Sequence, residues 1–130
     1  MKNCSFKIFI ILLFIPFFVN ADWILLFSKN EGDLYIDSQS INRKKNRIFF
    51  SQLVNYNTKK SSGASSFVSF SELDCKNLKV RDLKYELFIN KMGKGKNIYN
   101  GKPTKKWRKY EKGTSAFLLN KLMCERVYIK

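Results

Sequence analysis

The chain has 130 residues, with 25 lysines and arginines against 10 aspartates and glutamates, a net charge of +15 at pH 7 and no histidine. The lack of histidine removes the commonest general base and a frequent metal ligand, which argues against an enzyme or a metal centre. Neither a GxSxG motif nor a P-loop occurs, so serine-hydrolase and phosphate-cradling chemistry are not indicated. We therefore expect no catalytic residue, no metal site and no cofactor.

The first 21 residues have the composition of a secretory signal peptide. Lys2 and Lys7 precede an apolar run of twelve residues, 8–19, broken by a single proline. Such a run fits a signal-peptide core and is shorter than the roughly 20 residues of a transmembrane helix. Val19 and Ala21 favour cleavage after residue 21, and an uncleaved anchor is the weaker alternative. The mature protein should be exported, to the periplasm, the outer surface or the medium, without a transmembrane helix.

Cleavage after residue 21 of the 130 leaves 109 residues, 22–130, which is the size of one domain. Cys75 and Cys124 are its only cysteines. In an oxidising compartment such a pair forms a disulfide, and closing a loop of about 50 residues stabilises a fold by about 4 kcal/mol on chain-entropy grounds. Two free thiols or a zinc site are the alternatives. A zinc site lacks further ligands, because the chain has no histidine and no CxxC spacing.

Apolar and aromatic runs of strand length alternate with breaks rich in glycine and asparagine, which predicts an antiparallel sheet. The predicted strands are residues 23–28, 34–37, 47–57, 67–74 and 79–89. Turn-forming residues at 30–33 and 61–65 predict hairpins, and 41–46 is predicted to be a polar loop.

The last predicted strand separates its side chains onto two faces, with Leu83, Tyr85, Leu87 and Ile89 on one and Asp82, Lys84 and Glu86 on the other. We expect the second face to be solvated. Two carboxylates four residues apart on a strand lie about 13 Å apart, beyond the roughly 5 to 9.5 Å of a carboxylate pair in acid–base catalysis. Asp82 and Glu86 are therefore not predicted to be catalytic.

A short helix is predicted at the C-terminus, where Gly113-Thr114-Ser115 supplies a cap and Leu118, Leu119, Leu122 and Met123 recur at helical spacing. At about 100° per residue, Cys124 falls almost opposite the centre of this stripe. Either the helix unwinds before Cys124, or it is buried on more than one side. The predicted fold class is α+β: a small antiparallel β-sheet with a C-terminal α-helix packed on it, tied by one disulfide.

Several short segments follow the order and spacing of a bacterial family. They are Trp23, Asp33-Leu34-Tyr35-Ile36-Asp37, Ser40-Ile41, Leu53-Val54-Asn55-Tyr56, Ser69, Asp74-Cys75, Arg81, Trp107, Gly113-Thr114-Ser115 and Cys124. Over nearly all of residues 22–130 the chain thereby resembles the surface-adhesin protein E-like domain of exported bacterial proteins. The resemblance implies a small antiparallel sheet with a disulfide-tied helix, a non-enzymatic surface adhesin, and a Trp107 that packs under the helix. We expect both Trp23 and Trp107 to be core residues.

The positive charge gathers in one stretch, and there the chain departs from the family. Removing Lys2 and Lys7 with the signal leaves 23 basic and 10 acidic residues, a net charge of +13. Within residues 91–112, Glu111 is opposed by nine cations: Lys91, Lys94, Lys96, Lys102, Lys105, Lys106, Arg108, Lys109 and Lys112. Three glycines and a proline in this stretch predict a mobile loop with no regular element.

The predicted ligand-binding residues are Lys94, Lys96, Lys102, Lys105, Lys106, Arg108 and Lys109. A basic loop suits an anionic partner, such as a host extracellular-matrix protein with an acidic patch, a glycosaminoglycan or another anionic surface, and Tyr99, Trp107 and Tyr110 would add stacking or cation–π contacts. Alternatively, the domain is a periplasmic structural or interaction module whose lysines only keep it soluble. Nucleic acid also matches this charge, but export argues against it as the physiological partner.

Overall fold

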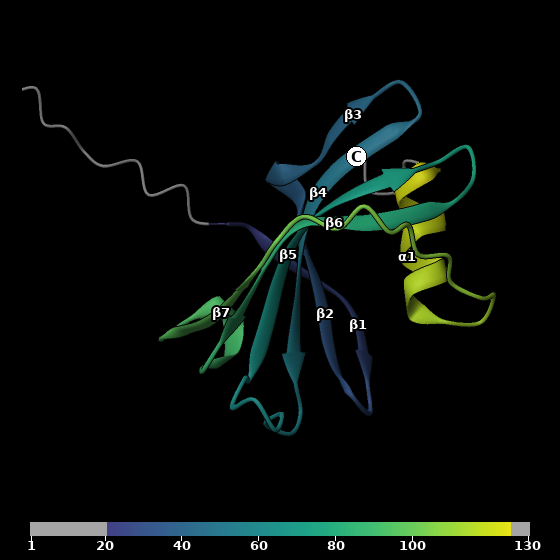
Figure 1. The fold of residues 1–130 in the computed structure, drawn as a ribbon. Helices are drawn as coiled ribbons and strands as arrows, with labels where there is room; N and C mark the ends of the chain where they lie inside the picture. Colours follow the sequence, from purple (N-terminus) through teal and green to yellow (C-terminus); the bar gives the residue numbers. More distant parts are fainter. Residues whose placement is uncertain (1–20, 126–130) are drawn as a thin grey trace, which may run out of the picture.

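The computed structural model describes residues 21–125 as one antiparallel sheet with a single helix (Figure 1). Its elements in chain order are β1 (Trp23–Lys29), β2 (Gly32–Asp37), the 3-10 turn η1 (Ser38–Ser40), β3 (Asn42–Lys44), β4 (Arg47–Tyr56), β5 (Ser66–Asp74), β6 (Lys79–Phe88), the 3-10 turn η2 (Lys91–Gly93), β7 (Asn97–Gly101) and α1 (Ser115–Cys124). The predicted α+β fold class is confirmed. Except for Ala21, the predicted signal peptide lies outside the described residues, so its cleavage stays a prediction.

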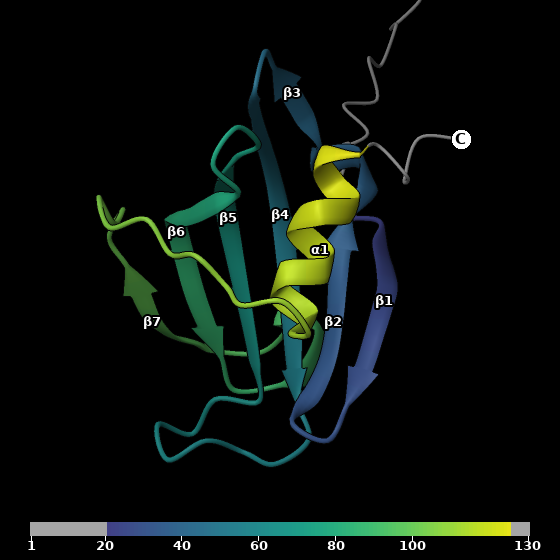
Figure 2. The same cartoon turned by 90° about the vertical axis from the view of Figure 1, so that its right-hand side faces the viewer.

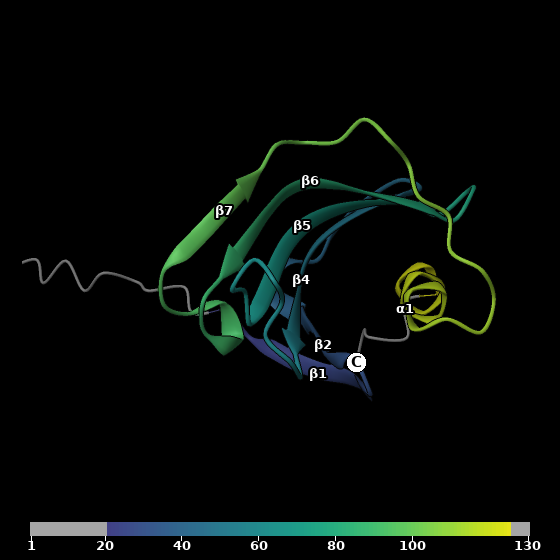
Figure 3. The same cartoon turned by 60° about the horizontal axis from the view of Figure 1, so that its bottom comes forward.

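The sheet is a meander in which each strand except β3 pairs with the strand before it in sequence, and β4 pairs with both β2 and β3. Its strand order is β1-β2-β4-β5-β6-β7, and β3 pairs only with β4. All of the paired strands are antiparallel, as hairpin connections require. Figure 3 shows the sheet curving from β7 to β1 with α1 on its concave side. No helix within residues 21–125 is long and apolar enough to cross a membrane.

The core lies where α1 packs on the concave face, and in Figure 2 the helix is seen in front of β2 and β4. Its buried side chains on the strands are Ile36, Ile48, Phe50, Leu73 and Val80. They face Leu119 and Met123 of the helix. Alternate residues of β4 and β5 thus point to the concave face, as the period of a strand demands. One half of the concave face is filled in this way, and the other half is left open.

The helix begins where the sequence predicts, because the Thr114 hydroxyl accepts a hydrogen bond from the Phe117 N–H at 3.2 Å. The predicted leucine stripe is only partly right. Leu118 is 44% exposed, whereas Leu119, Asn120 and Met123 are buried. Because the buried face is rotated toward Asn120, Cys124 lies at its edge, and the helix neither unwinds before that residue nor needs a second buried side.

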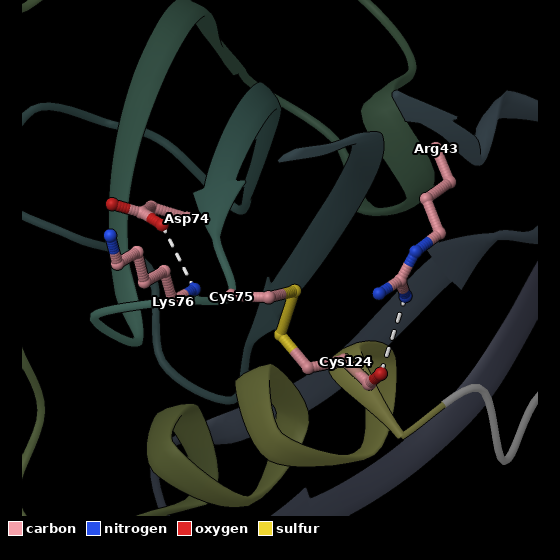
Figure 4. Close-up of a disulfide and its surroundings, with 5 residues drawn as sticks. All are labelled: Arg43, Asp74, Cys75, Lys76 and Cys124. Carbon is pink, nitrogen blue, oxygen red and sulfur yellow. Dashed lines mark hydrogen bonds between the residues drawn. A yellow bond between two sulfur atoms is a disulfide. The ribbon is translucent and has the colours of Figure 1, made fainter. Parts of the chain in front are cut away.

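The predicted disulfide between Cys75 and Cys124 is confirmed, with the two Cα atoms 5.6 Å apart (Figure 4). It ties the last turn of α1 to the turn that follows β5. The Arg43 guanidinium donates a hydrogen bond to the Cys124 carbonyl oxygen at 3.2 Å, so it satisfies one of the carbonyls left free at the helix end. The C-terminal turn of the helix is therefore fixed both covalently and by β3.

The short strand β3 overturns part of the polar-loop prediction for residues 41–46. Asn42, Arg43 and Lys44 pair with Phe49, Ile48 and Arg47 of β4. A two-residue turn at Lys45 and Asn46 joins the two strands, with Lys45 at a φ of 54°. Backbone hydrogen bonds and turn geometry form this hairpin, so a search for alternating apolar side chains does not detect it.

The prediction that residues 91–112 lack any regular element is wrong. η2 and β7 both lie in this stretch, and β7 pairs with β6 through Tyr85 to Phe88. η2 folds over the convex face, where a Cβ atom added to Gly93 would lie 3.0 Å from Val68 and 3.6 Å from Leu53. The Asn55 side-chain oxygen accepts from the Met92 N–H at 2.7 Å. Gly93 and Gly95, both with positive φ, thus serve a tight, packed turn.

A bulge in β6 overturns the prediction that Asp82 lies on a solvated face. Phe70 pairs with Lys84 while Ser71 pairs with Asp82, so Leu83 is an extra residue without a partner in β5. A bulge inverts the alternation beyond it. Asp82 therefore shares the concave face with Tyr85, and only 7% of its surface is exposed. Lys84, beyond the bulge, is exposed as predicted.

Asp74, next to the disulfide, makes the stability sensitive to acid. Burial alone would raise the pKa of its carboxyl, but hydrogen bonds from the Asn77 side chain and the Lys76 backbone N–H, together with nearby Arg47, lower it. A carboxylate with a lowered folded-state pKa stabilises the fold above its unfolded value of about 3.9. That contribution is lost as the pH falls below about 4 toward the lower folded-state pKa.

Asp74→Asn is accordingly expected to flatten the dependence of the free energy of unfolding on pH in this acidic range. Urea unfolding of the wild type and the variant, measured at steps between about pH 2 and pH 5, checks this. The wild type should lose more stability over these steps than the variant does. Parallel curves for the two proteins would contradict the role of Asp74.

Candidate functional site

The nine predicted cations of residues 91–112 do not form one loop. Lys91, Lys94 and Lys96 lie in η2 and the turn after it, whereas the other six follow β7. A five-residue strand is about 16 Å long, so β7 holds the two groups at its opposite ends. The structure thus brings together Lys102, Lys105, Lys106, Arg108 and Lys109, and separates Lys94 and Lys96 from them.

Residues 102–112, here called the basic segment, run beside β6 beyond the end of β7. The Thr104 N–H donates to the Asp82 carbonyl at 3.0 Å, and Arg108 and Val80 exchange two backbone hydrogen bonds at 2.8 and 3.0 Å. The segment is therefore attached to the sheet at Thr104 and at Arg108, and the mobility that its composition predicts stays a prediction. Among the described residues, its exposed cations that take part in no ion pair are Lys102, Lys105, Lys106, Lys109 and, at its far end, Lys112.

Trp107 lies between two guanidinium groups, so the prediction that it packs under the helix is wrong. The guanidinium carbons (Cζ) of Arg81 and Arg47 are 4.4 and 4.8 Å from its ring centroid. Arg81 follows Val80 of the helix-facing core, so its side chain points to the convex face. Glu72 holds both arginines, at 2.6 Å from Arg81 and 3.6 Å from Arg47. Trp107 thereby fastens the basic segment to the convex face.

Arg108 differs from the lysines because its charge is already paired. Its guanidinium lies 3.0 Å from the Asp82 carboxylate, whose side chain is 10% exposed, and 5.8 Å from the Tyr110 ring centroid. The Arg108 Nε is buried without a hydrogen-bond partner in the described part of the chain. Arg108 thus joins the basic segment to the concave face rather than adding a free cation to it.

The open half of the concave face is a groove, here called the concave groove. It consists of hollows of about 290 and 350 Å³ that share Phe67, Asp82 and Arg108. The first lies between the start of α1 and the β1-β2 hairpin, with Leu34, Val54 and Tyr56 among its walls. The second is closed by the basic segment, with Tyr85, Thr104 and Lys106 as the rest of its lining.

A chain of polar groups crosses the floor of the concave groove. The Gln52 amide donates to the Ser71 hydroxyl at 3.1 Å, and Ser71 donates to Asp82 at 3.2 Å. Ser69 lies 3.2 Å from the same hydroxyl, and the Asp82–Arg108 ion pair continues the chain. Buried polar groups linked in this way keep a fixed arrangement, which suits a preformed binding surface.

The concave groove was not predicted from the sequence, although two serines of β5 indicate a polar patch on the inner face of that strand. Ser69 and Ser71 occupy the same alternate positions of β5 as Leu73 and so lie on the same face, where small polar residues replace core residues toward one end of the strand. The bulge conceals the contribution of Asp82. No group of three or more acidic or cysteine side chains that could hold a metal ion occurs within residues 21–125.

Comparison with known proteins places the chain beside one family. The sequence profile of the family "Surface-adhesin protein E" matches residues 23–125. Crystal form II of Haemophilus influenzae protein E is similar in fold, with 20% sequence identity and a TM-score of 0.62 over 83% of this chain and 91% of that one. The selenomethionine form of the same protein has 19% sequence identity to this chain and a TM-score of 0.64, over 82% of this chain and 88% of that one. No curated protein matches the chain.

Proposed function

The chain belongs to the surface-adhesin protein E family, and on that premise we propose that it is an exported, non-enzymatic adhesin that binds an anionic polymer through the basic segment. In this proposal residues 1–21 direct export and are removed, and residues 22–130 form the single adhesin domain. The partner is a glycosaminoglycan or an acidic patch on a host extracellular-matrix protein. The groups assigned to binding are Lys102, Lys105, Lys106 and Lys109, with Lys94 and Lys96 at the far end of β7 as a secondary group.

One observation carries this proposal: four lysines are displayed on a backbone that is fixed at both ends. The hydrogen bonds at Thr104 and Arg108 hold the segment on β6, and Trp107 is held between Arg47 and Arg81. A backbone that is already held in place lowers the entropy lost when a ligand binds. Because they form no ion pairs with described residues, their charge is available to an anionic partner.

Retention on a heparin column tests the proposal. A variant with Lys102, Lys105, Lys106 and Lys109 changed to serine should elute at lower salt than the wild type. If each lysine pairs with one anionic group, the slope of log affinity against log salt falls by about 3 to 4. The matched control changes Lys45, Lys59, Lys76 and Lys79 to serine. These are exposed, form no ion pair with described residues and lie outside the basic segment.

The control variant loses the same charge, so it separates a located site from the general effect of a basic protein. It should elute close to the wild type. Equal elution of the two variants would reject the basic segment as the binding site and favour the alternative, a periplasmic interaction module whose lysines only keep it soluble. Cell fractionation of the mature protein then decides between the surface and the periplasm.

A further inference from the structure

Three aromatic rings form a ladder across β5, β6 and β7. The ring centroids of Phe67 and Tyr85 are 5.7 Å apart, and those of Tyr85 and Tyr99 are also 5.7 Å apart. Leu87 pairs with both Phe67 and Tyr99, so all three rings lie on the concave face. This aromatic ladder extends from the concave groove to the outer edge of the sheet.

A glycine gives the central ring its position. Gly101 is the β7 partner of Tyr85, and a Cβ atom added there would overlap the Tyr85 ring. The ring therefore lies directly over the backbone of β7, and it also lines the second hollow of the groove. The hydrogen bond with Tyr99, followed by burial and the nearby Asp82 charge, raises the pKa of the Tyr85 phenol above its usual value. Tyr85 is thus a neutral platform at neutral pH.

Exposure increases along the ladder toward the edge. Phe67 and Tyr85 are half-buried, whereas Tyr99 is 52% exposed. A large aromatic side chain on an open strand, next to two ordered rings, is the arrangement on which a flat ligand can stack. The second hollow, which Phe67 and Tyr85 line, also holds the polar and charged groups of Thr104, Lys106 and Arg108.

We infer that the aromatic ladder and the basic segment form one site for an acidic polysaccharide. Sugar rings lie on Tyr85 and Tyr99 with their apolar C–H faces, and Lys106 and its neighbouring lysines pair with carboxylate or sulfate groups. Hydroxyl groups of the sugar donate to the Asp82 carboxylate and exchange hydrogen bonds with Thr104. The inference rests on the proposed function and narrows its ligand from anionic polymers in general to polysaccharides.

The Asp82 carboxylate favours a polysaccharide over a nucleic acid, which also combines stacking with negative charge. The Asp82 oxygens, which already accept from Ser71 and pair with Arg108, offer their remaining acceptor positions to hydroxyl donors, and single-stranded DNA has no backbone hydroxyl. An acidic polysaccharide keeps free hydroxyl donors on its sugar rings beside its acidic groups. Charge alone would suit an acidic peptide equally well, but a peptide of glutamates has no ring to place on the ladder.

The test compares a short heparin oligosaccharide with polyglutamate of matched charge and with oligothymidylate, each titrated at one fixed salt concentration. Tyr99→Ser should weaken oligosaccharide binding about threefold to tenfold, the range expected for one aromatic contact, and change polyglutamate binding less than twofold. Tyr99→Phe keeps the ring and should bind as the wild type does. Phe70→Ser removes an exposed aromatic side chain, 37% exposed, from the convex face and serves as the matched control.

Several results would overturn the inference. They are an equal loss for Tyr99→Ser with all three probes, no loss with the oligosaccharide, or a loss with oligothymidylate as large as that with the oligosaccharide. If the four-lysine variant loses oligosaccharide binding while Tyr99→Ser does not, the proposed function stands and this inference fails. If the four-lysine variant binds normally, the proposed function itself fails. Thermal unfolding of each variant confirms that the domain is folded.

Discussion

Replacing Cys75 and Cys124 together by serine is expected to lower the free energy of unfolding by about 4 kcal/mol. The disulfide joins residues 49 positions apart, and without it the unfolded chain regains the entropy that the cross-link removes. Domains of this kind have a total stability of about 5 to 15 kcal/mol, so the variant should be close to unfolding at 37 °C. Urea unfolding followed by circular dichroism measures the change.

The reduced wild type is the control for this prediction, because it lacks the cross-link but keeps both sulfur atoms. It should unfold at nearly the same urea concentration as the double serine variant. A single variant, Cys75→Ser, should match both. If the double variant kept the wild-type midpoint, α1 would be held by packing alone, and the disulfide would have no role in stability.

Phe50→Ala is expected to cost about 3 to 5 kcal/mol, the usual range for truncating a buried aromatic side chain. Phe50 is fully buried in the centre of β4, in the core cluster that includes Leu119 and Met123 of α1. Truncation leaves a cavity beneath the helix, which the curved sheet cannot close without losing contacts elsewhere. Chemical unfolding, with the slope compared between proteins, measures the loss.

Phe70→Ala is the matched control, since Phe70 lies on the neighbouring strand and points to the opposite face. It is 37% exposed and its ring stacks on Phe49 at 6.3 Å, so its truncation should cost about 1 kcal/mol. Equal losses for the two variants would show that α1 does not depend on this core. A loss only at Phe50 would confirm that the helix-facing layer carries the stability.

Most of the fold could be predicted because the spacing of apolar residues shows the period of a strand or of a helix. The long strands β4, β5 and β6 lie within a residue or two of their predicted ranges, and Thr114 caps the helix as expected. The disulfide followed from having only two cysteines in an exported domain. β3 and β7 were missed because backbone pairing forms them, and their polar or glycine-containing sequences do not reveal it.

The candidate site was harder to predict because it depends on register. The single extra residue at Leu83 moves Asp82 from the predicted solvated face to the floor of the concave groove. Trp107 was predicted to be core because large aromatic side chains usually bury. It instead pairs with Arg47 and Arg81, which are distant in sequence. Neither the bulge nor this three-residue stack has a local pattern that a sequence can show.

The position of the disulfide affects what happens to the domain after a protease cuts it. The covalent loop from Cys75 to Cys124 contains β6, β7, the basic segment and nearly all of α1, and hence most of the groups assigned to binding. The exposed lysines of that segment are natural points of attack for a trypsin-like enzyme. A cut after Lys105 or Lys109 produces two fragments that remain one molecule, joined through sulfur and through the sheet. A nicked domain of this design can keep its parts together where an uncrosslinked domain would lose its C-terminal half.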